Sequence, residues 1–74
     1  MKKYVIVDQI RNGDCFETVC DTEIEALTRA NAEWRLLTDH DRNRREFYAV
    51  MCGDWDEEFG FDYNAATIIK AKKM

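Results

Sequence analysis

Residues 3–20, KYVIVDQIRNGDCFETVC, decide the fold of this chain. Residues 3–10 are rich in valine and isoleucine and predict a strand, and residues 15–20 predict a second one. Between them lies Asn12-Gly13, the strongest short hairpin signal, because both residue types tolerate a positive φ. The sequence therefore predicts an antiparallel hairpin at the start of the chain.

The register of this hairpin follows from the length of its loop. A two-residue Asn12-Gly13 loop would place Asp8 opposite Glu17, and like charges that face each other are unfavourable. A three-residue loop with a bulge at Gly13 shifts the pairing by one residue. We prefer the bulged loop, which sets five apolar side chains on one face: Tyr4, Ile6, Ile10, Phe16 and Cys20.

The residues after the hairpin carry a helix start signal. Residues 22–25, TEIE, form a capping box, in which the threonine accepts from a free backbone N–H and the second glutamate reaches back. The pattern predicts a helix over residues 23–37, with Ala26 and Ala32 adding helix propensity without bulk. Its apolar face follows the spacing that packing on a sheet requires: it consists of Ile24, Leu27, Ala30, Trp34 and Leu37.

The second half of the chain predicts a short helix and two more strands. Residues 38–41, TDHD, read as a second helix start, because acids are favoured at a helix N-terminus. Residues 46–52 predict a third strand that Gly53 ends, and residues 66–71 predict a closing edge strand. Lysines near that edge would discourage pairing: they are Lys70, Lys72 and Lys73.

These elements predict one α+β domain over residues 1–74. The fold class is a two-layer ββα(α)ββ arrangement, an antiparallel sheet of three or four strands with one long helix packed on one face. A chain of 74 residues has room for one small core. Because so small a domain buries only about 60% of the surface that its unfolded chain exposes, the length excludes a multidomain enzyme and a deep pocket.

Composition excludes several function classes. The sequence has no serine, hence no Ser–His–Asp hydrolase, and no glycine-rich phosphate motif. Its three cysteines cannot all pair internally and form no C-x-x-C, so we expect free thiols instead of a disulfide framework or a zinc site. His40 lies between two acids at a predicted helix start, which is typical of capping. We expect no enzyme, no catalytic residue, no cofactor, no metal and no small-molecule substrate.

The N-terminus and the apolar runs bear on localisation. No apolar run reaches the ~20 residues that span a bilayer. The N-terminal residues lack the apolar region and the small-residue cleavage site of a signal peptide. We expect a cytoplasmic protein with no membrane partner.

Residues 54–63, DWDEEFGFDY, are the unusual part of the sequence. Aromatic residues occupy odd positions, and acids occupy most of the even ones. In an extended segment this alternation would place aromatics on one side and carboxylates on the other, with neighbouring carboxylates about 6.5–7 Å apart. The aromatic residues are Trp55, Phe59, Phe61 and Tyr63, and the acids are Asp54, Asp56, Glu57, Glu58 and Asp62.

Three interpretations of this stretch are open. In the first, the aromatics complete the core and the acids are solvated. In the second, the stretch is a calcium loop, but Phe59 stands where an EF-hand needs glycine and Ala65 where it needs glutamate. In the third, the acids form a surface that occupies a basic groove built for phosphates, and electrostatic complementarity selects the partner.

A basic cluster offers a different surface. It consists of Arg35, Arg42, Arg44 and Arg45. Arg42 and Arg45 are three residues apart and would share a helical face. Nucleic-acid binding needs concentrated positive charge, whereas Asp39, Asp41 and Glu46 are interspersed here and favour pairing on a solvated face. A small RNA-binding domain that uses these arginines stays as an alternative.

Five short segments follow one another along most of the chain. They are Lys3 to Val7, Asn12-Gly13-Asp14, Glu17-Thr18, Glu33-Trp34-x-x-Leu37-Thr38 and Arg44 to Tyr48. In this order they resemble small proteins encoded on phages and mobile elements of Gram-positive bacteria. The resemblance implies a protein that blocks a host enzyme, and it assigns no site residue. Anti-CRISPR proteins look similar in size and charge, and some imitate nucleic acid.

The sequence therefore predicts a small acidic binding protein of phage or mobile-element type, with a net charge of −4, that docks on a host protein. A host enzyme that binds nucleic acid is one candidate for that partner. The predicted partner-binding residues are Asp54, Trp55, Asp56, Glu57, Glu58 and Asp62, with Trp55 as an aromatic anchor. An anti-CRISPR-type inhibitor that competes with nucleic acid is the sharper alternative. A homodimer through the final edge strand is a further one.

Overall fold

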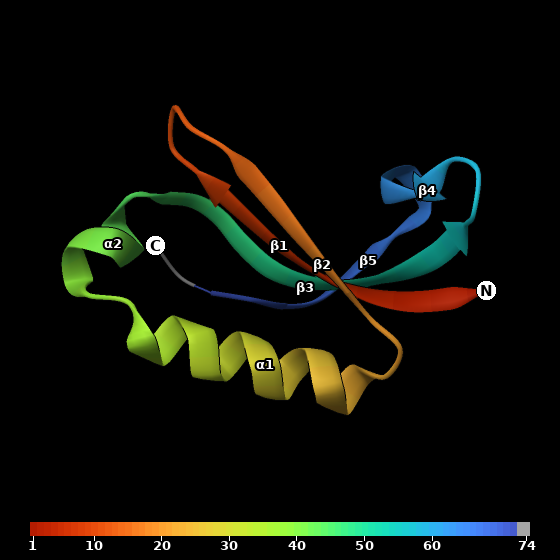
Figure 1. Ribbon diagram of the computed structural model, residues 1–74, viewed down its shortest axis with the longest axis horizontal. Helices are drawn as coiled ribbons and strands as arrows, with labels where there is room; N and C mark the ends of the chain where they lie inside the picture. The colour runs from red at the N-terminus through yellow and green to blue at the C-terminus, as the bar shows by residue number, and fades with distance from the viewer. Residues whose placement is uncertain (73–74) are drawn as a thin grey trace.

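The computed structural model describes residues 1–72, which form a curled antiparallel sheet with one long helix on one face (Figure 1). The predicted α+β layout is confirmed. The strands are β1 (Lys2–Ile10), β2 (Cys15–Cys20), β3 (Arg45–Asp56), β4 (Gly60–Phe61) and β5 (Thr67–Ala71). The helices are α1 (Glu23–Leu36) and α2 (Asp39–Asn43), and η1 (Tyr63–Ala65) is a single 3₁₀ turn.

The long strand β3 lies in the middle of the sheet. The sheet runs β2-β1-β3, and β3 then pairs with β5 along its middle and with β4 at its end. All of these pairings are antiparallel. No helix within residues 1–72 has both the length and the apolar character needed to cross a bilayer.

The hairpin adopts the shifted register that we preferred. Asp8 pairs with Phe16 instead of Glu17, so the two carboxylates are not directly opposed. The loop is closed by Ile10, whose N–H donates to the Asp14 carbonyl oxygen at 2.9 Å. The left-handed residue is Asn12, with φ 57°, whereas we expected the bulge at Gly13. Asparagine is one of the few residues with a side chain that adopt this conformation readily.

The core between α1 and the sheet differs from the predicted helical face at Ile24 and at Leu37, which is the C-cap after Leu36 and lies outside the buried cluster. Thr22 caps helix α1, as predicted, since its hydroxyl accepts from the Glu25 N–H at 3.2 Å. The second half of the capping box, a bond from the Thr22 N–H to the Glu25 carboxylate, is not among the hydrogen bonds of residues 1–72. However, Ile24 is 78% exposed, and Ala26 is fully buried in its place. Small alanines at the contact allow close approach to the sheet. The buried cluster is Ile6, Cys20, Ala26, Ala30, Tyr48 and Val50, with Tyr4, Leu27 and Trp34 packed around it.

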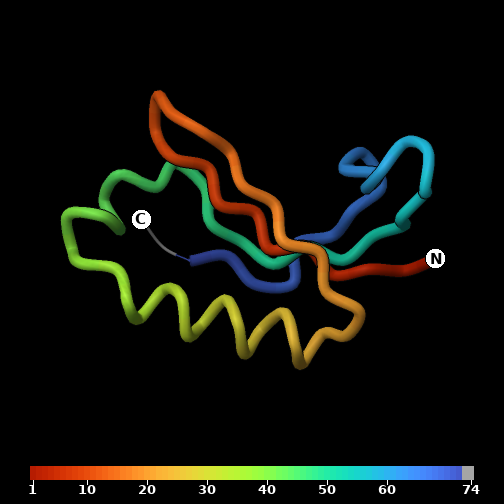
Figure 2. Tube along the Cα trace, in the orientation of Figure 1, coloured from red at the N-terminus to blue at the C-terminus, as the bar shows by residue number. Residues whose placement is uncertain are grey.

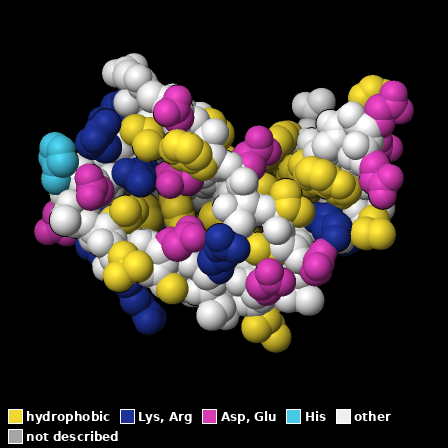
Figure 3. Space-filling view, viewed as in Figure 1, with side chains coloured by type: hydrophobic (Ala, Val, Ile, Leu, Met, Phe, Trp, Pro, Cys, Tyr) yellow, Lys and Arg dark blue, Asp and Glu magenta, His cyan; other side chains and the backbone are white. Residues whose placement is uncertain are grey.

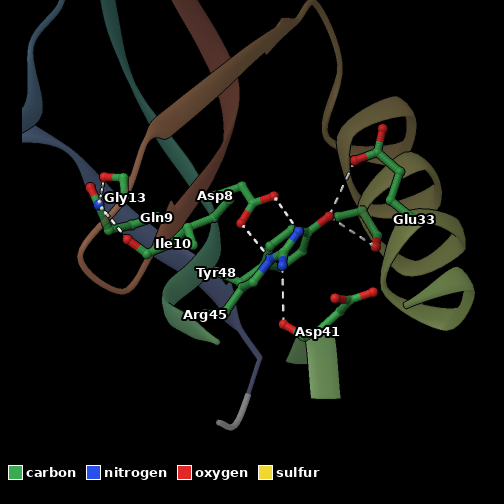
Figure 4. Close-up of polar contacts among 9 residues, drawn as sticks. Asp8, Gln9, Ile10, Gly13, Glu33, Asp41, Arg45 and Tyr48 are labelled. Atoms are coloured by element: carbon green, nitrogen blue, oxygen red, sulfur yellow. Dashed lines mark hydrogen bonds and ion pairs between the residues drawn. The ribbon is translucent and has the colours of Figure 1, made fainter. Parts of the chain in front are cut away.

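Tyr48 ties α1 to β3 at the centre of this core. Its hydroxyl lies 3.3 Å from both the Ala30 carbonyl oxygen and the Glu33 carboxylate, so it donates to the helix from the sheet (Figure 4). Its ring packs against Trp34 with 5.1 Å between centroids. Burial, and then the nearby Glu33 charge, raise the pKa of Tyr48 well above its usual value.

The opposite face of the sheet has a core of its own, which the sequence pattern did not predict. Strand β3 continues through Gly53 to Asp56, so the expectation that Gly53 ends the strand is wrong. Gly53 is buried because the chain folds back over it: a Cβ there would lie 2.9 Å from Phe61 Cζ. The residues buried on this face are Val5, Val7 and Phe61, with Phe47, Met51, Trp55 and Ala66 packed against them.

Gly53→Ala should therefore loosen the layer above it while leaving α1 in place. Overpacking of this kind costs typically about 1–3 kcal/mol of unfolding free energy, to be measured by urea denaturation. Trp55 fluorescence should change as Phe61 moves. The contrasting variant is Gly60→Ala, at φ 79° with nothing within 4 Å, which strains only the backbone. An unchanged stability and an unchanged fluorescence for Gly53→Ala would contradict this packing.

Tyr48→Phe should change how stability depends on alkaline pH. Because folding raises the pKa of Tyr48, the folded state favours the protonated phenol, and this stabilisation is lost as pH rises above about 10, where an exposed tyrosine ionises. The variant should lose about 1 kcal/mol at neutral pH for the hydrogen bond. Its unfolding free energy should then fall less steeply above pH ~10 than that of the parent chain. Parallel declines in the two proteins would refute this role.

Candidate docking surface

The predicted partner-binding residues lie in one small substructure, residues 54–66, which we call the acidic lobe. It consists of the end of β3, a turn, β4 and η1, and it stands on the face of the sheet away from α1 (Figures 1 and 2). Trp55 pairs with Phe61 across β3 and β4. The Trp55 N–H also donates to the Met1 carbonyl oxygen at 2.7 Å, so the chain start is fixed beside the lobe.

Two aspartates build the turns of the acidic lobe. The Asp56 carboxylate accepts from the Glu58 N–H at 2.7 Å and from the Phe59 N–H at 3.0 Å. These two hydrogen bonds are the main reason that the pKa of Asp56 is lowered. Asp62 caps η1 by accepting from the Asn64 N–H at 3.1 Å. Both aspartates thus have a local structural role in addition to their charge.

The predicted alternation of aromatics and acids holds only where the lobe is extended. Trp55 is half-buried and Phe61 is buried, and both face the sheet. Residues 57–59 form a turn, which breaks the period of two and leaves Phe59 81% exposed. Tyr63 stacks edge-on against Phe61 at 4.9 Å and hydrogen-bonds Glu17 of β2. The most exposed aromatic of the lobe is therefore Phe59, while Trp55 packs against the sheet.

A groove of about 580 Å³ crosses the acidic lobe. Its lining residues include four aromatics and the three aspartates Asp54, Asp56 and Asp62. Acidic side chains gather on the outer edge of this lobe in the space-filling view (Figure 3). The groove is lined by Met1, Asp54, Trp55, Asp56, Phe59, Gly60, Phe61, Asp62, Tyr63 and Asn64.

The carboxylates of the acidic lobe form no ion pair with a cation among residues 1–72. All five acids at positions 54, 56, 57, 58 and 62 are exposed. The ion pairs among residues 1–72 are Lys3–Asp21, Arg29–Glu33, Arg42–Asp39 and Arg45–Asp8. None of them uses a lobe carboxylate. The lobe therefore carries five acids without a direct ion pair to a described cation, and its nearest cations are Lys2, which pairs with Asp54 across the sheet, and the N-terminal ammonium, whose charge helps to lower the pKa of Asp56.

Two of the four arginines of the alternative site, Arg42 and Arg45, are held by internal contacts, and Arg42 also donates to the Arg35 carbonyl oxygen at 3.3 Å. Arg42 donates to the Trp34 carbonyl oxygen at 3.1 Å and pairs with Asp39. Arg45 starts β3 instead of extending α2, so it does not share a helical face with Arg42. It pairs with Asp8 at 3.0 Å and reaches the Asp41 carbonyl oxygen (Figure 4). Of the set, Arg35 and Arg44 are exposed.

Side chains that could act as nucleophiles or ligands are dispersed. Burial raises the pKa of the Cys20 thiol, which favours the unreactive protonated form. Cys15, Cys20 and Cys52 are all free. Among residues 1–72, no three His, Cys, Asp or Glu side chains are grouped so that they could hold a metal ion. His40 is exposed on α2.

Comparisons with protein-family models, with curated proteins and with solved structures found no match. The resemblance to small phage and mobile-element proteins stays a prediction.

Asp56 separates the structural role of the lobe acids from their charge. Asp56→Asn keeps a side-chain oxygen that can accept from the Glu58 and Phe59 N–H groups, whereas Asp56→Ala removes it. We expect Asp56→Ala to destabilise the turn by about 0.5–2 kcal/mol, as loss of a backbone cap does, and Asp56→Asn to cost less. Amide hydrogen exchange at Glu58 and Phe59 reports this directly. Equal exchange rates in the two variants would contradict the assigned hydrogen bonds.

Proposed function

We propose that this chain is a non-enzymatic binding protein whose acidic lobe docks onto a cationic surface of a partner protein. The observation that carries the proposal is the groove, whose lining combines aromatic residues with Asp54, Asp56 and Asp62, none of which forms an ion pair with a described cation. Unpaired charge near apolar surface is typical of a recognition site, since opposite charge on the partner speeds association and fixes its orientation.

The chemistry of the groove favours arginine or lysine side chains on the partner. A guanidinium group pairs with carboxylates and also stacks on aromatic faces. Phe59 offers an exposed ring beside these acids, and Tyr63 offers a partly exposed one. We infer that Phe59 is the aromatic anchor and that Trp55, the anchor suggested by the sequence, positions the strand beneath it.

A partner that binds nucleic acid is the sharper form of this proposal. Asp54 and Asp56 are two residues apart on β3, so their side chains leave the same face at the spacing of about 6.5–7 Å expected of alternate residues in a strand. A basic groove built for phosphates would accept such a row. An anti-CRISPR-type inhibitor of phage or mobile-element origin would act in this way. The free thiols support a cytoplasmic setting, where disulfides are rare.

The RNA-binding alternative is less well supported, because Arg42 and Arg45 have internal partners. It predicts a mobility shift of RNA at low salt that depends on Arg35 and Arg44. The docking proposal, in contrast, predicts no mobility shift of RNA.

The docking proposal can be tested with arginine-containing peptides and a charge-matched pair of variants. The lobe variant is Asp54→Asn/Asp56→Asn/Asp62→Asn, in which asparagine can replace the capping oxygens. The control variant is Asp14→Asn/Glu23→Gln/Glu46→Gln, which changes the net charge equally at exposed positions outside the lobe. Affinity is measured by fluorescence anisotropy over a salt series.

We expect the lobe variant to bind at least about tenfold more weakly, as loss of more than 1.4 kcal/mol would produce. We also expect it to lose most of its salt dependence, while the control variant stays within a few-fold of the parent chain. Equal losses in both variants would assign the binding to net charge alone. Absence of peptide binding by the parent chain would refute the docking proposal.

A further inference from the structure

Among the described strands, β2 forms one outer edge of the sheet, and β5, together with the two-residue β4, forms the other. An edge strand presents unpaired backbone N–H and C=O groups, and proteins commonly protect such edges with lysine, proline or a bulge. The two edges of this sheet differ in that respect, and the difference points to an interaction surface distinct from the acidic lobe.

The β5 edge is protected. It carries Lys70, is followed by Lys72 and has an irregular pairing opposite Val50 and Met51 of β3. Lys72 also turns back toward α1 to hydrogen-bond Asn31. A homodimer through this strand, which the sequence suggested, would bring these lysines of two copies together.

The β2 edge has none of these protections. Its six residues, CFETVC, include no lysine, proline or glycine, and they pair with β1 without a register shift. Two large apolar side chains of this strand are exposed to solvent, Phe16 by 54% and Val19 by 41%. A regular, unprotected strand of this kind is suited to pairing with another strand.

We propose that β2 pairs with β2 of a second copy of this chain. The pairing is antiparallel around a two-fold axis, with Thr18 of one copy facing Thr18 of the other. Such an axis is perpendicular to the sheet, so one residue of β2 must face the same residue of the second copy. The identity of this central residue fixes the register of the whole pairing. The choice among registers follows from the acids of the strand.

Neighbouring registers place like charges in opposition. Centring on Glu17 sets the two Glu17 carboxylates face to face, and centring on Val19 sets Glu17 opposite Asp21. Like charges that face each other directly are unfavourable. Centring on Phe16 avoids this but places Val19 opposite Gly13 in the loop, so part of the strand loses its partner.

The register centred on Thr18 avoids all three problems. It sets Phe16 opposite Cys20 and Glu17 opposite Val19, and it pairs almost the whole strand. Two threonines facing each other across strands are a favourable pair. The result is one continuous sheet in the order β5-β3-β1-β2-β2-β1-β3-β5, with both copies of α1 on one face and both acidic lobes on the other.

The proposal is tested by sedimentation equilibrium on the full chain from micromolar to millimolar concentrations. The matched variants are Val19→Lys and Val19→Glu. In the proposed register, residue 19 of each copy faces Glu17 of the other, so every dimer contains two such pairs. Both variants lose the same valine, and circular dichroism checks that both are folded. At about 0.2–1 kcal/mol for each cross-strand pair, we expect Val19→Lys to tighten the dimer by about 2- to 30-fold relative to an uncharged pair and Val19→Glu to weaken it similarly.

A cysteine at position 18 measures the register. Facing residues in an antiparallel pair have Cα atoms about 4.5–5.5 Å apart, within the range that a disulfide spans. In a Cys15→Ala background, Thr18→Cys should give a covalent dimer on mild oxidation, and Lys70→Cys on β5 should not. A monomer at every concentration would overturn the proposal, as would a dimer insensitive to residue 19 or cross-linked through residue 70. Long polymers would indicate head-to-tail pairing of β2 with β5 instead.

Salt separates this contact from docking by the acidic lobe. Added salt screens the acids that flank β2 and should strengthen the dimer, whereas it should weaken the binding of a cationic partner to the lobe. The lobe variant described above should dimerise like the parent chain. The peptide-binding and sedimentation experiments can therefore refute the docking proposal and the dimer proposal independently.

Discussion

The structure depends on the alternation of side chains along β3. Tyr48 and Val50 point to α1, while Met51, Gly53 and Trp55 belong to the opposite face. The same strand pairs with β1, β4 and β5, so both layers are joined through its backbone. A shift of one residue in its pairing with β1 would exchange the two faces and expose both cores. For a chain with so little core, this constraint leaves one arrangement that buries both sets of side chains.

Much of the fold could be predicted from short sequence patterns because the interactions behind those patterns join residues that are close in the sequence. The opposed carboxylates in the unshifted hairpin identify the register, and the Thr22 cap identifies the start of α1. Errors arose where tertiary contacts decide. Periodicity favoured the larger Ile24 for the core, but the sheet accepts only the small Ala26 at that distance. Gly53 resembles a strand breaker in the sequence, and only the returning Phe61 ring explains why glycine lies inside a strand.

The candidate site shows the same division. The sequence identifies which residues are acidic and aromatic, but it does not say which of them make internal contacts and so are not free to bind a partner. Trp55 and Arg45 both looked available for a partner, and each has an internal contact instead. Phe59 looked like the other aromatics of the stretch, and a single turn makes it the most exposed of them. Whether a carboxylate is neutralised by a distant cation is a property of topology, which composition does not contain.

The lobe is built so that its surface can vary without loss of its fold. Trp55 and Phe61 hold it to the sheet by apolar contact, and Asp56 and Asp62 shape its turns through hydrogen bonds that asparagine can also make. Glu57 and Glu58 are exposed in the turn, and their side chains have no hydrogen bond or ion pair among the contacts of residues 1–72. Charge at those two positions repels its neighbours, so stability alone gives no reason for it. A binding partner that supplies the missing positive charge does give one, and this is the physical argument for a docking surface at the acidic lobe.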